Sequence, residues 1–126
     1  MTFFKHAYAL HDYLRFGEGR SLGWKYVPQK DPKDYVFKKR FDGVWFSIRW
    51  HESYYMNTVD VLATPVSPAV RFGTVGYDSP LYDEARDATQ AWINVEGKTL
   101  PEIEDEIRKL VSVYKSYANP AQHKKR

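Results

Sequence analysis

Tyr35-Val-Phe-Lys-Lys-Arg-Phe41, Asp42-Gly43 and Val44-Trp-Phe-Ser-Ile-Arg-Trp50 are consecutive segments of this chain, and together they decide its fold. Asp-Gly between two apolar runs rich in β-formers is the strongest short-range signal for a β-hairpin. Both central residues of the tight turn need positive φ, which glycine adopts freely and aspartate tolerates. With Asp-Gly as the loop, the residues that face each other are Phe41 and Val44, Lys39 and Phe46, Phe37 and Ile48, and Tyr35 and Trp50.

Because side chains alternate along a strand, this register divides the hairpin into two faces. One face is apolar except for Lys39 and is expected to join the core. Lys39 is expected near a sheet edge, with its stem packed and its ammonium in water. A slip of one residue would bury three cations, so the register is well specified. The second face, expected to meet solvent or a partner, pairs Arg40 with Trp45, Lys38 with Ser47, and Val36 with Arg49.

Two segments have the apolar spacing of amphipathic helices. The first covers residues 2–16, with Thr2 as the expected N-cap and Phe3, Ala7, Leu10 and Leu14 on one stripe. The second begins at the capping box Thr99-Leu-Pro-Glu102 and ends at Asn119-Pro120. Its apolar stripe consists of Leu100, Ile103, Ile107, Leu110, Tyr114 and Tyr117.

Weaker patterns predict the remaining elements. The glycine-rich segment 17–23 fits no phosphate-binding fingerprint and is expected to be a plain loop. Ser79-Pro80 favours the start of a short helix that ends at about Asp87. Strands are expected at 24–27, 54–63, 70–77 and 89–95.

The elements together predict an α+β fold. We expect an antiparallel sheet of about four to five strands, with the long C-terminal helix and the N-terminal helix packed on one of its faces. A chain of 126 residues has the size of one domain. That domain is expected to cover residues 1–118, followed by a basic and flexible tail at 119–126.

Composition restricts the cellular location and the side-chain chemistry that we expect. The chain has no cysteine, which excludes disulfides, a thiol nucleophile and thiolate metal sites. It has no run of about 18 apolar residues and no secretory signal, so a cytoplasmic protein without a membrane segment is expected. Charge is uneven: residues 1–50 carry a net +5, residues 51–118 a net −5, and residues 119–126 a net +3. Such a distribution favours a basic face and an acidic face.

The second face of the hairpin is the strongest candidate for a binding site. Lys38, Arg40 and Arg49 around Trp45 combine cations with an aromatic plane, as in proteins that hold single-stranded nucleic acid. An acidic protein surface could bind there equally well. Arg40 over Trp45 as an internal cation–π pair is the structural alternative. The sequence therefore predicts a small non-enzymatic accessory protein that recognises nucleic acid, a nucleoprotein or another protein, without cofactor or metal.

Two other functions stay open. A phosphodiester-cleaving enzyme could use His51 as general base beside Glu52, with Arg49 holding a phosphate. A homo-oligomer could use the surplus aromatic residues and the opposite charges of the two halves for self-association. His6 and His11 are five residues apart, which places them about 140° apart on a helix and argues against a shared metal ion.

Overall fold

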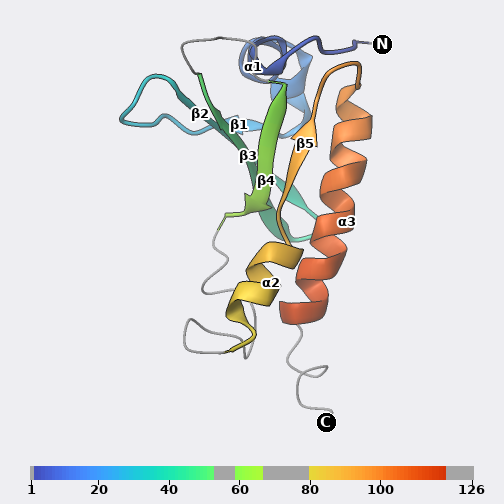
Figure 1. The fold of residues 1–126 in the computed structure, drawn as a ribbon. Helices are drawn as coiled ribbons and strands as arrows, with labels where there is room; N and C mark the ends of the chain where they lie inside the picture. Colours follow the sequence, from blue (N-terminus) through green and yellow to red (C-terminus); the bar gives the residue numbers. More distant parts are fainter. Residues whose placement is uncertain (1, 53–58, 67–79, 119–126) are drawn as a thin grey trace.

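The computed structural model describes residues 2–52, 59–66 and 80–118, which form an antiparallel five-stranded sheet and its helices (Figure 1). The strand order is β1-β2-β3-β4-β5, so every strand lies beside its neighbour in the sequence. The expected α+β class is confirmed. The helices are α1 (Ala7–Arg15), the 3-10 helix η1 (Glu18–Leu22), α2 (Tyr82–Ala88) and α3 (Leu100–Ala118). The strands are β1 (Lys25–Tyr26), β2 (Asp34–Phe41), β3 (Val44–His51), β4 (Asp60–Pro65) and β5 (Ala91–Asn94).

The hairpin β2–β3 has the register that the sequence predicts. Phe41 pairs with Val44, and the pairing continues to Asp34 and His51. Asp42 has φ 50° and Gly43 has φ 83°, the positive values that a two-residue hairpin loop needs. The two faces of the hairpin are therefore those expected from alternation.

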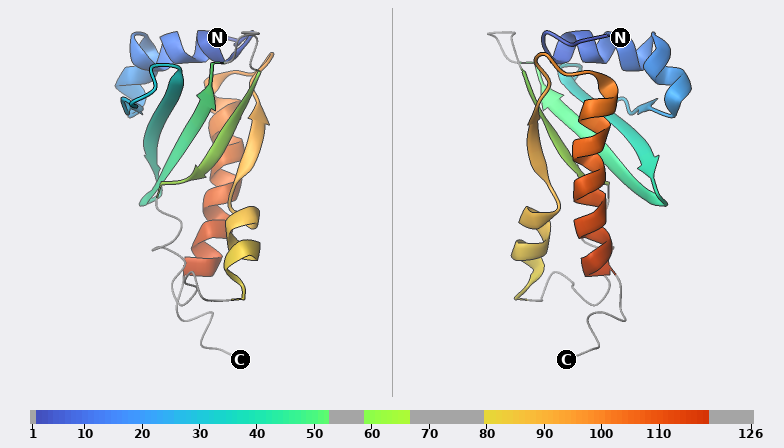
Figure 2. Two further views of the ribbon diagram at one scale, coloured as in Figure 1. Left: turned by 60° about the vertical axis from the view of Figure 1, so that its left-hand side comes forward. Right: turned by 90° about the vertical axis from the view of Figure 1, so that its right-hand side faces the viewer.

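The long helix α3 covers one face of the sheet, as the right-hand view of Figure 2 shows. The predicted capping box is present, since the backbone N–H and the hydroxyl of Thr99 both donate to Glu102 Oε1 at 3.0 Å. Its buried stripe includes Leu100, Ile103, Ile107 and Tyr114 as expected, and also Val111.

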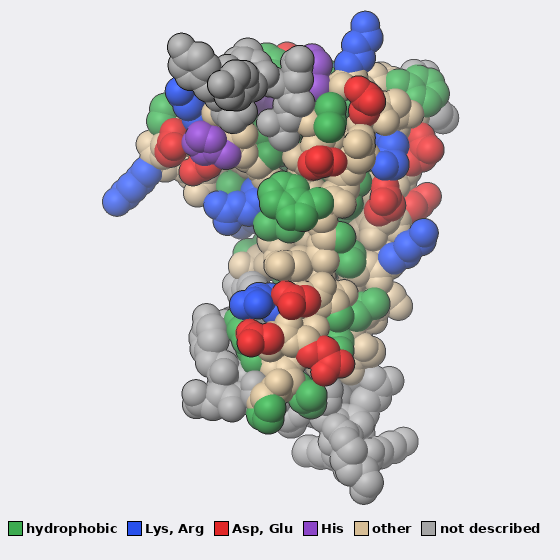
Figure 3. Space-filling view, in the orientation of Figure 1, with side chains coloured by type: hydrophobic (Ala, Val, Ile, Leu, Met, Phe, Trp, Pro, Cys, Tyr) green, Lys and Arg blue, Asp and Glu red, His purple; other side chains and the backbone are tan. Residues whose placement is uncertain are grey.

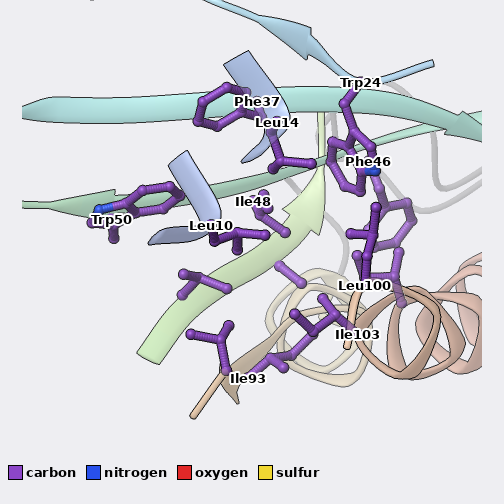
Figure 4. Packing of buried hydrophobic residues seen from close by; sticks show 14 of the residues in the cluster. Leu10, Leu14, Trp24, Phe37, Phe46, Ile48, Trp50, Ile93, Leu100 and Ile103 are labelled. Carbon is purple, nitrogen blue, oxygen red and sulfur yellow. The ribbon is translucent and has the colours of Figure 1, made fainter. Parts of the chain in front are cut away.

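The core lies between the sheet and the helices α1 and α3. Figure 4 shows Leu10 and Leu14 of α1 on the same side of the sheet as Phe37 and Trp50. Further along the sheet, α3 completes the same cluster. Residues from both helices thus bury one face of the sheet, and the placement of both helices on one face is confirmed. Among the described residues, no helix has the length and apolar character needed to cross a membrane.

The start of the chain differs from the prediction. The helix begins at Ala7, not at Thr2, and its N-cap is His6, whose Nδ1 accepts the N–H of Ala9. The preceding residues are not helical. The N–H of Phe4 donates to the carbonyl of Lys98, and the N–H of Gly97 donates to the carbonyl of Phe4. This pairing buries Phe4 and leaves Phe3 exposed, so Phe3 is not part of the buried stripe.

Other expectations are met in part. The segment 17–23 contains the short helix η1 where a plain loop is expected. The strand expected at 54–63 is observed only as β4, because residues 53–58 lie outside the described part of the chain. The strand expected at 70–77, the cap at Ser79 and the tail 119–126 also lie outside it.

The placement predicted for Lys39 is wrong. Its side chain is only 17% exposed, and its ammonium lies 2.8 Å from Oε2 of Glu104, a side chain that is 10% exposed. The same oxygen accepts the indole N–H of Trp24 at 2.8 Å. The cation lies inside the molecule because α3 supplies an acid beside it, in a contact between residues 65 positions apart.

Candidate functional site

The face of the sheet turned away from α1 and α3 carries most of the predicted binding residues. In the left-hand view of Figure 2 the strands lie in front of α3, and no described helix covers them. We call this surface the open face. Alternation and register assign to it Lys25 of β1; Asp34, Val36, Lys38 and Arg40 of β2; Trp45, Ser47, Arg49 and His51 of β3; Asp60, Leu62 and Thr64 of β4; and Trp92 and Asn94 of β5.

Trp45 is flanked by two lysines on the open face. The ammonium groups of Lys25 and Lys38 lie 5.4 Å and 5.2 Å from the centre of its ring. The cation–π pair of Arg40 with Trp45, the structural alternative to a binding role, is not among the described contacts, although the two residues are paired across the hairpin. Arg40 is exposed instead. Two lysines beside the indole keep positive charge at the ring. An exposed cation–π contact of this kind contributes about 0.5–1 kcal/mol of stabilisation.

Trp92 is the most accessible tryptophan among the described residues. It belongs to the edge strand β5, is 65% exposed, and faces the same way as Arg49 through the pairing of both residues with Leu62. Neighbouring strands are about 4.8 Å apart, so the backbones of Arg49 and Trp92 are separated by roughly 10 Å. Figure 3 shows a large hydrophobic side chain exposed over the strands with a basic side chain next to it.

The structure brings the four predicted binding residues Lys38, Arg40, Trp45 and Arg49 onto one face and adds Lys25 and Trp92. Alternation alone could have predicted that Trp92 faces away from the core, because Ile93 and Val95 of the same segment are buried. Lys25 could not be found in this way, since the register of β1 against β2 is set by the core and not by a tight turn.

The three residues of the catalytic alternative do not come together. His51 and Arg49 lie on the open face, whereas the carboxylate of Glu52 accepts the hydroxyl of Tyr35, a core-side residue, at 2.6 Å. That hydrogen bond, followed by burial, raises the pKa of Tyr35 from 10.0 to about 12. Glu52 is thus engaged away from the imidazole.

His51 has other acidic neighbours. Its Nε2 lies 3.1 Å from Oδ2 of Asp31 and 3.9 Å from Oδ1 of Asp34. The backbone N–H of Lys33, and then the imidazole of His51, lower the pKa of Asp31. One nitrogen and two carboxylate oxygens from these side chains lie within 4.8 Å of one another, so a divalent cation could be held there. Sequence reasoning missed this cluster because Asp31 precedes the hairpin in an irregular segment.

The open face therefore has a basic half near the hairpin turn, which carries Trp45, and an acidic end at Asp34 and Asp60; Arg49 and Trp92 lie between the two. Comparisons with protein-family models, with curated protein sequences and with solved structures find no match for this chain, so its function has to be inferred from these surfaces.

Proposed function

We propose that the protein binds single-stranded nucleic acid on the open face of its sheet, without a cofactor. The observation that carries this proposal is the pair of tryptophans on one face, with Trp92 65% exposed and Trp45 flanked by lysines. Every base has a flat face that can stack on an aromatic ring, which makes such binding tolerant of sequence. On this proposal, the open-face cations contact the phosphates of the same nucleic-acid strand.

The division of roles follows from exposure. Trp92 offers a bare ring on which a base can stack, at about 1–3 kcal/mol per base. Trp45 is partly covered by its lysines, so its surroundings are better suited to a phosphate than to a second base. The acidic end at Asp34 and Asp60 repels phosphates, which favours a strand path along the basic half. An acidic protein would use the cations but would not require the indole of Trp92.

The test is fluorescence anisotropy with labelled single-stranded oligonucleotides of about 4–16 nucleotides and with a duplex, at low salt. We expect single strands to bind more tightly than the duplex. Trp92→Ala and the double variant Lys38→Ala, Arg40→Ala should each weaken binding. Lys109→Ala is the control, because Lys109 is an exposed cation on α3, away from the open face. Absence of binding at low salt, or equal binding by wild type and the double variant, overturns the proposal.

A second candidate, phosphodiester cleavage, is favoured by the cluster of His51, Asp31 and Asp34. The same oligonucleotides, incubated with Mg²⁺ or Mn²⁺ and run on denaturing gels, separate the two functions. Intact strands are the result expected for a binding protein. Scission that is lost in His51→Ala makes the protein a nuclease, whereas scission that persists in this variant excludes His51 as its base.

Self-association, the remaining alternative, has a direct readout. Sedimentation at several salt concentrations gives the oligomeric state, and Trp92→Ala tests whether the exposed indole of the edge strand is the contact. A monomer at low salt excludes this function and leaves the indole free for a ligand.

A further inference from the structure

A pocket of about 460 Å³ lies between the end of α1, helix η1 and strand β1. It is lined by three cations, Arg15, Arg20 and Lys25, and by the rings of Phe16, Trp24 and Tyr26. None of its lining residues is acidic. We call it the basic pocket. Its volume falls within the range of about 300–1,000 Å³ that is usual for small-molecule sites.

The cations of the basic pocket have no acidic partner in the part of the chain that the structure describes. Among the described residues, Arg15, Arg20 and Lys25 form no ion pair with a carboxylate, although ten other pairs of acidic and basic groups lie within 4 Å of each other. The nearest acid in the sequence, Glu18, accepts the hydroxyl of Tyr13 at 3.3 Å and lines a different pocket. Arg15 and Arg20, which pair with no described carboxylate, concentrate positive potential at this hollow, which favours an anionic ligand.

The aromatic side chains restrict the kind of anion. The guanidinium of Arg15 lies 4.1 Å from the ring centre of Tyr26 and 5.1 Å from that of Phe16. Phe16 is 69% exposed, so much of its ring is free for contact. A simple inorganic anion would use the cations and leave these rings bare. A ligand with a planar ring and a phosphate uses both.

We propose that the basic pocket binds a nucleotide, with its phosphate held by Arg15 and Arg20 and its base against Phe16 and Tyr26. This goes beyond the proposed function, because it requires a separate site that shares only Lys25 with the open face. The nucleotide can come from two sources: a free mononucleotide, or the terminal nucleotide of a strand that leaves the open face at β1. Lys25 is the residue through which such a strand would pass.

The first experiment is calorimetric titration of the full chain with adenosine 5′-monophosphate and uridine 5′-monophosphate, with adenosine and inorganic phosphate as partial ligands. Saturable nucleotide binding is expected, at least about tenfold tighter than binding of either partial ligand, because each lacks one set of contacts. The Nε1–H resonance of Trp24, assigned in ¹H–¹⁵N spectra, should shift on addition, since this ring lines the pocket.

Substitution locates the site. Arg20→Ala should weaken nucleotide binding about tenfold or more, and the fold should persist because the Arg20 side chain is exposed and has no described partner. Lys109→Ala is the matched cation control and should leave it unchanged. Conversely, loss of strand binding in the variant Lys38→Ala, Arg40→Ala with intact mononucleotide binding shows that the open face and the pocket act separately.

Oligonucleotides with and without a terminal phosphate distinguish the two sources. A preference for the phosphorylated end that is lost in Arg20→Ala identifies a strand terminus as the ligand, and equal affinity for both ends identifies the free nucleotide. Absence of saturable binding at millimolar nucleotide overturns the inference. So does binding of inorganic phosphate as tight as that of nucleotide, or an equal loss of affinity in Arg20→Ala and Lys109→Ala.

Discussion

At Glu104, one carboxylate oxygen contacts the ammonium of Lys39 and the indole N–H of Trp24, each at 2.8 Å. These contacts join α3 to strand β2 and to the residue before β1. A buried ion pair is not in itself strong evidence for stability, because both charges lose their hydration. The removal of one partner is costly, however, since the remaining charge then has no compensation. The packing of α3 against Lys39 and Trp24 therefore depends on the carboxylate of Glu104.

Glu104→Gln should lower the free energy of unfolding by about 3 kcal/mol, because Lys39 is left as an unpaired and largely buried cation. Urea denaturation measures the change. Adding Lys39→Met should recover part of the loss by removing that cation. Asp105→Asn is the control: its carboxylate is exposed and pairs only with Arg108 among the described residues, so a change below about 0.5 kcal/mol is expected. If the double variant is less stable than Glu104→Gln, the pair is not the reason for the loss.

Tyr35 makes the stability of the protein sensitive to alkaline pH. Its pKa in the folded protein is raised from 10.0 to about 12 by the hydrogen bond to Glu52 and by burial. Above pH 10 the unfolded chain releases the phenol proton and the folded protein retains it, so stability falls as pH rises from about 10 to 12. In urea titrations at pH 9 to 12, Tyr35→Phe should show a shallower decline than wild type. Parallel declines for both proteins would remove Tyr35 from this role.

The element that determines the most about this fold is the two-residue turn of the hairpin. Gly43 has φ 83°, and a Cβ built on it meets no atom within 4 Å. Gly43→Ala should therefore cost about 1 kcal/mol through backbone conformation alone, with no clash. Thermal unfolding measures the cost, and oligonucleotide binding should be unchanged once the protein is folded. A cost above about 3 kcal/mol would mean that the turn also packs against something else.

The hairpin register, the α+β class and the capping box of α3 could be predicted from sequence because each depends on neighbouring residues. The contact of Lys39 with Glu104 could not, since it depends on the angle at which α3 crosses the sheet. The start of α1 was predicted wrongly for a similar reason. Phe4 pairs with the turn before α3, and that distant contact outweighs the local helical pattern. The same holds for the binding surface. The sequence predicted its hairpin residues, which depend on local pairing, but not Lys25 or the basic pocket, which depend on contacts between distant segments.

On the scale of the whole molecule, the uneven charge of the sequence becomes an uneven distribution of charge among the elements. Residues 1–50, with a net +5, supply β1 to β3 and both the open-face cations and the basic pocket. The acids of the following residues gather on α2 and α3, as Figure 3 shows over α2. A polyanion is thus attracted to the elements of residues 1–50 and repelled from α2 and from the acidic first turns of α3.

The dependence of binding on salt tests this division quantitatively. Among the described residues, the open face carries the cations Lys25, Lys38, Arg40 and Arg49. If each neutralises one phosphate of a single strand, the logarithm of the affinity should fall with the logarithm of the salt concentration with a slope of about −3. Lys38→Ala should reduce the magnitude of that slope by about 0.7.

Trp92→Ala should behave differently, because stacking releases no counterions. We expect an affinity lower by about 5- to 150-fold, equivalent to about 1–3 kcal/mol, at an unchanged slope. Anisotropy titrations at four or more salt concentrations measure both quantities for each variant. A slope that changes with Trp92→Ala but not with Lys38→Ala would contradict the assignment of stacking to the edge strand and of phosphate contacts to the hairpin. The separation of stacking from phosphate contacts depends on the register of β5. The alternation that buries Ile93 turns Trp92 toward the open face, where the nucleic acid is proposed to bind.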